Sequence, residues 1–263
     1  MAQMTKEVFM AAAKRAAAST WTSELNTIMG VGYDTGLALS AKEFDAMVFK
    51  TSDVSGVEAA LRKRIAKYNL AKATSLDVRM SNPPGTTPDP AILTAISARL
   101  PSLSKEDLQK MSDGHQLAMA AENIMGYLLE GYLARHLTPY GFIHCAGEIL
   151  RSADFITTAG QVWQVKNSDN SENSSSSQVR NGTTIGHWCR RRSKPVSAKS
   201  GKQPFYWGEL QAAFGIPAEA WQNEEKFQEF VRECITINSG LLHVTTPTIT
   251  APDKPAKKQL GLF

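Results

Sequence analysis

The pattern of apolar and polar positions predicts a helical first part of the chain. In residues 53–73, apolar side chains recur at steps of three and four, at Val57, Leu61, Ile65 and Tyr68, which is the spacing of one buried helical face. Similar patterns predict three more helices, over 5–18, 40–49 and 104–122. A helical N-terminal region over residues 1–114 is therefore expected.

The polar side of the helix predicted over 53–73 is basic. It carries Arg62, Lys63, Arg64 and Lys67. Such a row is typical of a solvated helical face, and contact with a DNA backbone is the alternative. Residues 81–90 hold four prolines and a glycine, which predict a long loop because proline breaks both helices and strands.

From residue 115 the pattern changes from helix to strand. Residues 115–137 predict a long helix that ends at Thr138, Pro139 and Gly141. Residues 153–166 predict two strands joined by a turn at 157–160. Helices over 207–214 and 218–234, a strand over 241–246 and a loose tail over 251–263 are expected to follow. The fold class expected for residues 115–250 is α/β, with a central mixed sheet flanked by helices.

Composition places the chain among ordinary globular proteins. Of its 263 residues, 42% are hydrophobic and 21% are charged. No apolar run approaches the roughly 20 residues that span a bilayer. Lys14 and Arg15 interrupt the Ala-rich start, which argues against a signal peptide. A cytoplasmic protein without a membrane partner is expected.

The cysteines and histidines do not form a transition-metal motif. The three cysteines lie more than 40 residues apart, and the five histidines lack an HxxxH or HExxH spacing. Zinc chemistry is therefore disfavoured.

Positive charge is concentrated in one segment. The net charge is +4, but no acidic residue lies between Glu172 and Glu209, where seven basic residues occur. Without these seven the chain is slightly acidic. A local basic segment suits the binding of a polyanion such as DNA, and a solvated basic loop is the alternative.

The predicted hairpin carries a set of side chains that suits Mg²⁺. Gln164 and Lys166 lie two residues apart on a strand, so they share a face. Asp154 lies on the preceding strand. A carboxylate, a second oxygen ligand and a lysine together suit metal-assisted hydrolysis of a phosphodiester.

A helical glutamate can complete this set. Glu130 and Glu122 both lie on the apolar stripe of the helix over 115–137, where a carboxylate is costly unless it has a partner or a function. Burial alone does not choose between them.

These residues resemble the motifs of the PD-(D/E)XK nucleases. GYLLE at 126–130 is followed by Gly141 and Phe142, then by SADF at 152–155 and QVK at 164–166. The resemblance implies a restriction-endonuclease-like core in which Glu130, Asp154, Gln164 and Lys166 are catalytic, with the first three holding Mg²⁺. Gln164 departs from the usual acid, and an amide oxygen brings no charge to the metal.

The segment after Lys166 is similar to that of type II restriction endonucleases of the SinI and AvaII kind, which read GGWCC. Residues 167–194 are therefore expected to be a DNA-recognition segment, because Asn, Ser and Arg contact phosphates and base edges. The candidates for DNA contact are Asn167, Ser168, Asn170, Asn173, Arg180, Asn181, Arg190, Arg191 and Arg192. A flexible Ser/Asn linker is the alternative, and Trp188 is expected to pack in the core.

The resemblance implies a Mg²⁺-dependent type II endonuclease that cuts both strands of DNA at a specific sequence. By analogy it implies a homodimer, since a palindromic site suits a two-fold symmetric enzyme, and a methyltransferase partner of the same specificity. A structure-specific repair or recombination nuclease and a non-catalytic DNA-binding relative are the alternatives.

Overall fold

The computed structural model describes residues 3–73, 89–169, 185–197 and 203–242. The chain divides into two compact units. Unit 1 comprises Met1–Met80 and Met125–Asn238, and unit 2 comprises Ser81–Ile124 and Ser239–Phe263. The boundary expected near residue 114 lies inside one continuous helix, α7 (Lys105–Leu137), which passes from unit 2 into unit 1.

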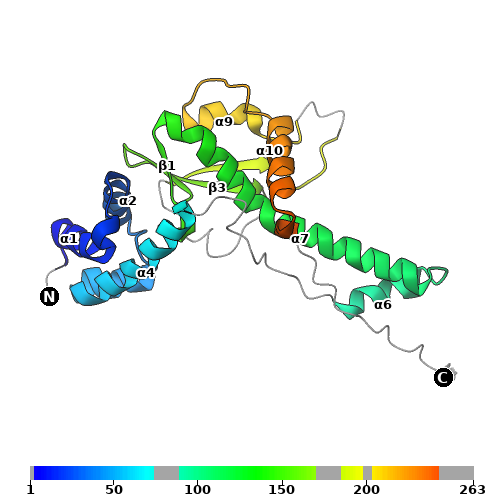
Figure 1. Cartoon of the computed structure of the whole chain (residues 1–263), viewed down its shortest axis with the longest axis horizontal. Helices are drawn as coiled ribbons and strands as arrows, with labels where there is room; N and C mark the ends of the chain where they lie inside the picture. Colours follow the sequence, from blue (N-terminus) through cyan, green and yellow to red (C-terminus); the bar gives the residue numbers. More distant parts are fainter. Residues whose placement is uncertain (1–2, 74–88, 170–184, 198–202, 243–263) are drawn as a thin grey trace. The chain divides into compact units, whose positions relative to one another are not determined.

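Helices form the N-terminal part of unit 1 (Figure 1). In order they are α1 (Lys6–Ala17), η1 (Ala18–Thr20), α2 (Ser23–Asp34), α3 (Ala41–Phe44), the π-helical η2 (Asp45–Lys50) and α4 (Val54–Ala73). Side-chain caps set several starts: Thr5 accepts from Val8 N–H and Thr22 from Leu25 N–H. Helices α1, α4 and the α3–η2 pair lie where the apolar pattern predicts them.

Helix α2 was not predicted, and its glycines explain why. Gly30 and Gly32 lower helix propensity. At Gly32 the packing requires glycine, because a Cβ there would lie 2.6 Å from the Leu150 side chain and 2.9 Å from that of Ala38. The same contact places α2 against the segment that leads to the hairpin.

The sheet has four strands in the order β1-β2-β3-β4. They are β1 (Phe142–His144), β2 (Phe155–Thr157), β3 (Val162–Ser168) and β4 (Gly186–Arg191). The first two pairings are antiparallel and the β3–β4 pairing is parallel, which confirms the expected mixed sheet and hairpin. The three-residue β1 and the basic β4 were not predicted as strands.

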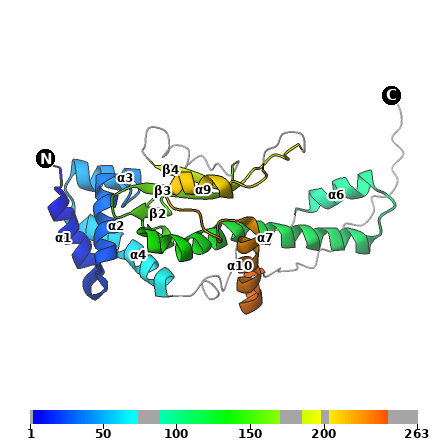
Figure 2. The ribbon, with the colours of Figure 1, turned by 90° about the horizontal axis from the view of Figure 1, so that it is seen from above.

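The two faces of the sheet pack against different helices. On one face Ile143, Ile156 and Val162 join the apolar core of the N-terminal helices. On the other face Trp163 stacks on Phe214 of α9 (Trp207–Phe214), with ring centroids 4.6 Å apart. Figure 2 shows α9 beside β3 and β4. The N-terminal helices therefore support the sheet directly.

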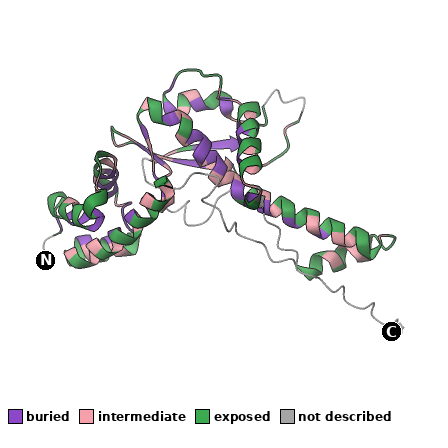
Figure 3. Cartoon of the chain, viewed as in Figure 1, coloured by how far each residue is buried: buried purple, intermediate pink, exposed green. Residues whose placement is uncertain are grey.

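Aromatic side chains join α7, α9 and α10 (Glu224–Ile237). Tyr132 of α7 meets Trp207, Phe227 and Phe230, with centroids 5.3–6.0 Å apart, and Trp188 is 4% exposed, as expected of a core residue. Figure 3 shows the buried stripe on this part of α7. The three cysteines are buried and none forms a disulfide.

Other boundaries differ from the sequence prediction. Helix α6 (Pro90–Arg99) was missed, and the helix expected at 218–234 begins at Glu224, where Asn223 caps it. The strand expected at 241–246 is wrong at its start, which is the 3-10 helix η6 (Ser239–Leu242); the rest, like the tail over 251–263, lies outside the described residues. The remaining short 3-10 helices are η3 (Thr138–Tyr140) and η4 (Ala146–Glu148). Of the helices described, none is both long and apolar enough for a bilayer.

Candidate active site

Asp154 lies just before β2 and is fixed to the neighbouring strand. Its carboxylate Oδ2 accepts a hydrogen bond of 2.7 Å from the N–H of Val165 in β3. Its own N–H donates to the carbonyl of Trp163, and its carbonyl accepts from the N–H of Cys145. These bonds hold the carboxylate beside the strand that carries Gln164 and Lys166.

The surroundings of Asp154 favour its neutral form. Burial, and secondly the negative charge of Glu130, raise its pKa to about 7. The Val165 N–H, Lys166 and His144 act in the opposite direction and only partly offset this. An acid in this state is stabilised as a carboxylate by any cation that binds beside it.

Glu130 reaches the site from α7 and contacts His144 of β1. The distance from His144 Nε2 to Glu130 Oε2 is 3.6 Å, and the Glu130 side chain is 35% exposed. His144 stacks on Phe155 with ring centroids 5.2 Å apart. Sequence reasoning missed His144 because it belongs to no spacing motif and lies in a three-residue strand.

The structure distinguishes the two candidate glutamates. Glu130 acts on the pKa of Asp154, whereas Glu122 is exposed and belongs to the other unit. Of the two, Glu130 is therefore the one that the fold brings to Asp154.

Gln164 is buried with an unsatisfied oxygen. The residue is 3% exposed, and within the described chain its Oε1 has no hydrogen-bond partner. A buried acceptor without a partner costs on the order of 1–3 kcal/mol. Coordination of a cation by this oxygen would remove that cost.

Lys166 shares a face of β3 with Gln164 and with Val162. In the parallel register Lys166 pairs with Cys189 and Ser168 pairs with Arg191, so Arg191 of β4 projects from this same face. The Arg191 side chain has intermediate exposure and makes no hydrogen bond or ion pair with another described residue. Lys166 and Arg191 thus place positive charge on the face that carries Gln164.

Arg190 projects from the opposite face and is enclosed. It is 7% exposed, its Nη1 lies 2.6 Å and 2.8 Å from the two carboxylate oxygens of Glu224, and its Nε donates to Asn167 Oδ1 at 2.9 Å. The guanidinium carbon Cζ of Arg190 lies 4.8 Å from the ring centroid of Phe227. Through these contacts Arg190 and Asn167 connect the sheet to α10.

Arg192, which follows β4, is held by hydrogen bonds. Its Nε donates to the Gln203 carbonyl and its Nη1 to the Tyr206 hydroxyl. Tyr206 in turn donates to Asp169, which follows β3. Ser168 is buried. Asn170, Asn173, Arg180 and Asn181 lie outside the described residues.

The residues present fit a divalent cation whose ligands are not all acids. Over the described chain, no group of three or more His, Cys, Asp or Glu side chains is arranged to hold a metal. The site instead offers two carboxylates, Asp154 and Glu130, and the unsatisfied amide oxygen of Gln164. Carboxylate and amide oxygens are ligands that Mg²⁺ and Ca²⁺ accept.

Comparison with known proteins identifies similar proteins and a family. Residues 40–236 match the model of the SinI restriction endonuclease family. The chain is 42% identical to "Type II restriction enzyme Eco47I" of Escherichia coli over 121 residues, which are 44% of this chain and 52% of that protein. It is 36% identical to "Type II restriction enzyme SinI" of Salmonella infantis over 145 residues, 49% of this chain and 63% of that protein.

The chain thus spans between about half and two thirds of the length of these two relatives. The family match covers both the N-terminal helices from α3 onward and the sheet with its hairpin. Because that match extends over most of the sequence, the chain belongs to the SinI restriction endonuclease family.

Proposed function

We propose that this protein is a Mg²⁺-dependent type II restriction endonuclease with a PD-(D/E)XK active site. The observation that carries the proposal is the hydrogen bond from Val165 to Asp154, which joins a carboxylate of raised pKa to the strand of Gln164 and Lys166. Asp154, Glu130 and Gln164 would hold the metal. Bound there, Mg²⁺ would polarise the scissile phosphate and lower the pKa of an attacking water.

The remaining chemistry comes from side chains of this face. Lys166 would orient the attacking water and offset the charge of the scissile phosphate. Arg191, on the same face, would hold a neighbouring phosphate. Hydrolysis would proceed in one step, without a covalent enzyme intermediate.

Specificity is proposed to come from the segment that joins β3 to β4. Both relatives carry the names of type II restriction enzymes, and the site expected from the sequence is GGWCC. Asn170, Asn173, Arg180 and Asn181 remain candidates for base or phosphate contact. A homodimer would cut both strands of such a palindrome, and a methyltransferase of the same specificity is the expected partner.

The test is incubation of the purified protein with unmethylated phage DNA, with Mg²⁺ and with EDTA. Discrete bands that need Mg²⁺ are expected, and sequencing of the ends should give GGWCC. Bands that map to junctions or flaps instead would identify a structure-specific nuclease. Salt-sensitive DNA binding without cleavage would identify a non-catalytic relative. This is the main alternative, because Gln164 has an amide where the family motif has an acid.

A further inference from the structure

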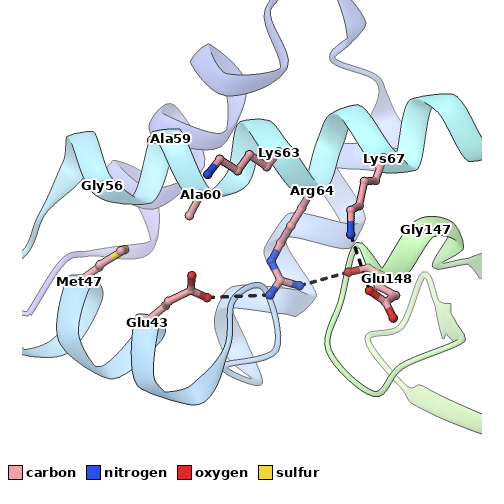
Figure 4. Close-up of a pocket in the computed structure, with 10 residues that line it drawn as sticks. All are labelled: Glu43, Met47, Gly56, Ala59, Ala60, Lys63, Arg64, Lys67, Gly147 and Glu148. Atoms are coloured by element: carbon pink, nitrogen blue, oxygen red, sulfur yellow. Dashed lines mark hydrogen bonds and ion pairs between the residues drawn. The ribbon is translucent and has the colours of Figure 1, made fainter.

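A basic cavity lies on unit 1 and does not include the proposed metal ligands. It encloses about 480 Å³ between α4, the α3–η2 pair and the η4 loop. Its charged lining is formed by Lys63, Arg64 and Lys67 of α4, with Glu43 and Glu148. Figure 4 shows the three basic side chains arranged along one side of α4.

The η4 loop is pressed against α4. Gly147 has φ +65°, and a Cβ there would lie 2.8 Å from the carbonyl oxygen of Lys67. Glycine is required both by this backbone conformation and by the close approach. The loop continues to Arg151, whose N–H donates to the Leu37 carbonyl at 2.8 Å. Because Arg151 precedes Asp154 by three residues, their Cα atoms lie within about 11 Å.

The positive charges of the cavity are incompletely balanced. Arg64 Nη2 lies 3.9 Å from Glu43, a long ion pair, and the Glu43 carboxylate already accepts from Ser40 N–H at 3.0 Å. Lys67 lies 4.0 Å from Glu148, and both side chains are exposed. Lys63 makes no ion pair with any residue that the structure describes.

Arg151 has a donor without an acceptor. Its Nε is buried and has no hydrogen-bond partner in the described ranges. Burial and the like charge of Arg64 lower the pKa of Arg151. Arg64 Nη1 donates to the carbonyl of Glu148 at 3.1 Å, three residues before Arg151, so the two arginines belong to neighbouring segments. An anion beside them would satisfy the buried donor of Arg151 and offset both charges.

The position of the cavity favours a DNA phosphate as that anion. Val162 packs against the core of the N-terminal helices, and Gln164 and Lys166 continue its face along β3. Gln164 is buried, but Lys166 and Arg191 of this face are partly exposed, so a duplex that contacts these two residues would lie beside the N-terminal helices. We propose that Lys63, Arg64, Lys67 and Arg151 bind a backbone phosphate of the duplex outside the base pairs that are read. This site rests on the proposed function and extends its DNA footprint onto α4.

The experiment measures binding of the full chain to a duplex without the recognition site, in EDTA, over a range of salt concentrations. The triple variant Lys63→Gln, Arg64→Gln, Arg151→Gln should reduce the slope of log affinity against log salt by about 0.9 for each phosphate that is no longer bound. Arg62→Gln is the matched control, because Arg62 lies on the same helix but pairs with Glu58 at 2.9 Å and does not line the cavity. Arg64→Lys keeps the charge and should keep the slope.

The outcomes separate this site from the cleavage activity. An unchanged slope in a folded triple variant, or the same change in Arg62→Gln, would overturn the proposal even if the protein cleaves DNA. A reduced slope supports it even if the protein does not cleave. Inorganic phosphate could also raise the melting temperature of the wild type and not that of the triple variant. If the two proteins then show the same slope of log DNA affinity against log salt, the cavity binds free phosphate and the DNA assignment is wrong.

Discussion

The N–H of Val165 donates to Oδ2 of Asp154 at 2.7 Å, so the strand that carries Gln164 and Lys166 also holds the carboxylate that precedes β2. This bond crosses the hairpin between side chain and backbone. A shift of β3 relative to β2 would therefore break this bond and separate the carboxylate from the amide and the lysine. The hairpin acts as a single positioning element for the proposed chemistry.

Replacing Asp154 with Asn should abolish cleavage and stabilise the metal-free protein at alkaline pH. The pKa of Asp154 is about 7 in the folded chain and about 3.9 in an unfolded one. Below about pH 4 both states hold the proton, so folding has no penalty. As pH rises from 4 to 7 the unfolded state ionises while the folded acid stays protonated, and stability is lost, by up to about 4 kcal/mol.

Thermal melts in EDTA check this prediction. At pH 8 the Asn variant should melt above the wild type, and the two should converge near pH 4. Added Mg²⁺ should raise the melting temperature of the wild type alone, because only it retains the ligand. Equal melting temperatures of the two proteins at pH 8 would contradict the conclusion that burial and Glu130 raise the pKa of Asp154.

Replacing Gln164 with Glu should tighten metal binding and weaken the metal-free fold. The residue is 3% exposed, and a third carboxylate beside Asp154 and Glu130 adds charge for the cation and repulsion without it. We expect half-maximal cleavage at a Mg²⁺ concentration lower by on the order of tenfold, with a lower melting temperature in EDTA.

Gln164→Met is the matched control for this change. It nearly preserves volume and removes the unsatisfied oxygen, so the metal-free protein should be as stable as the wild type or more so. Its metal-dependent cleavage should fall. Full activity in the Met variant would show that the amide is not a ligand.

Much of this site could be predicted from the sequence because its parts are local. Gln164 and Lys166 share a face by the two-residue period of a strand, and the turn at 157–160 brings Asp154 to them. What could not be predicted depends on contacts between distant segments. The choice of Glu130 over Glu122, the approach of His144, and the enclosure of Arg190 by Glu224 all require the packing of α7 and α10 against the sheet.

The missed elements have similar causes. Helix α2 has two glycines, and the need for Gly32 is set by Leu150 and Ala38 across the core. Strand β4 carries Arg190 and Arg191 in succession, and a run of basic residues does not predict a half-buried strand. Arg190 can be buried in β4 because it pairs with Glu224, which lies 34 positions later in the sequence. Local pattern cannot reveal partners at such separations.

Glu130→Ala should reduce cleavage by at least on the order of 100-fold, more than an outer-shell change would. Glu122→Ala should leave the rate near that of the wild type, because this side chain is exposed and surface changes have small effects. Cleavage rates of both variants, measured at saturating Mg²⁺ and over a Mg²⁺ titration, check this prediction. Loss of cleavage only in the Glu122 variant would reverse the assignment.

Lys166→Ala should eliminate cleavage while DNA affinity in EDTA changes little. The lysine is proposed to act on the water and the scissile phosphate, and one ammonium contributes only one of many phosphate contacts. Gel-shift and cleavage assays on the same preparation compare the two properties. A Lys166→Ala variant that cuts at the wild-type rate would remove Lys166 from the active site.

Arg190→Ala and Arg191→Ala should have different effects, although the residues are neighbours. Arg190 is paired with Glu224, whose Oε2 also accepts from Trp207 Nε1 at 3.0 Å. Removal of Arg190 would leave the Glu224 carboxylate, whose side chain is only 17% exposed, without its cation. Breaking such a pair costs about 3–5 kcal/mol, which should appear as a lower midpoint of urea unfolding. Arg191 projects from the face that carries Lys166, so Arg191→Ala should keep the free energy of unfolding within about 0.5 kcal/mol of the wild type and weaken DNA binding. If Arg190→Ala unfolds like the wild type, or if Arg191→Ala destabilises the fold without affecting DNA affinity, the two faces of β4 have been assigned the wrong roles.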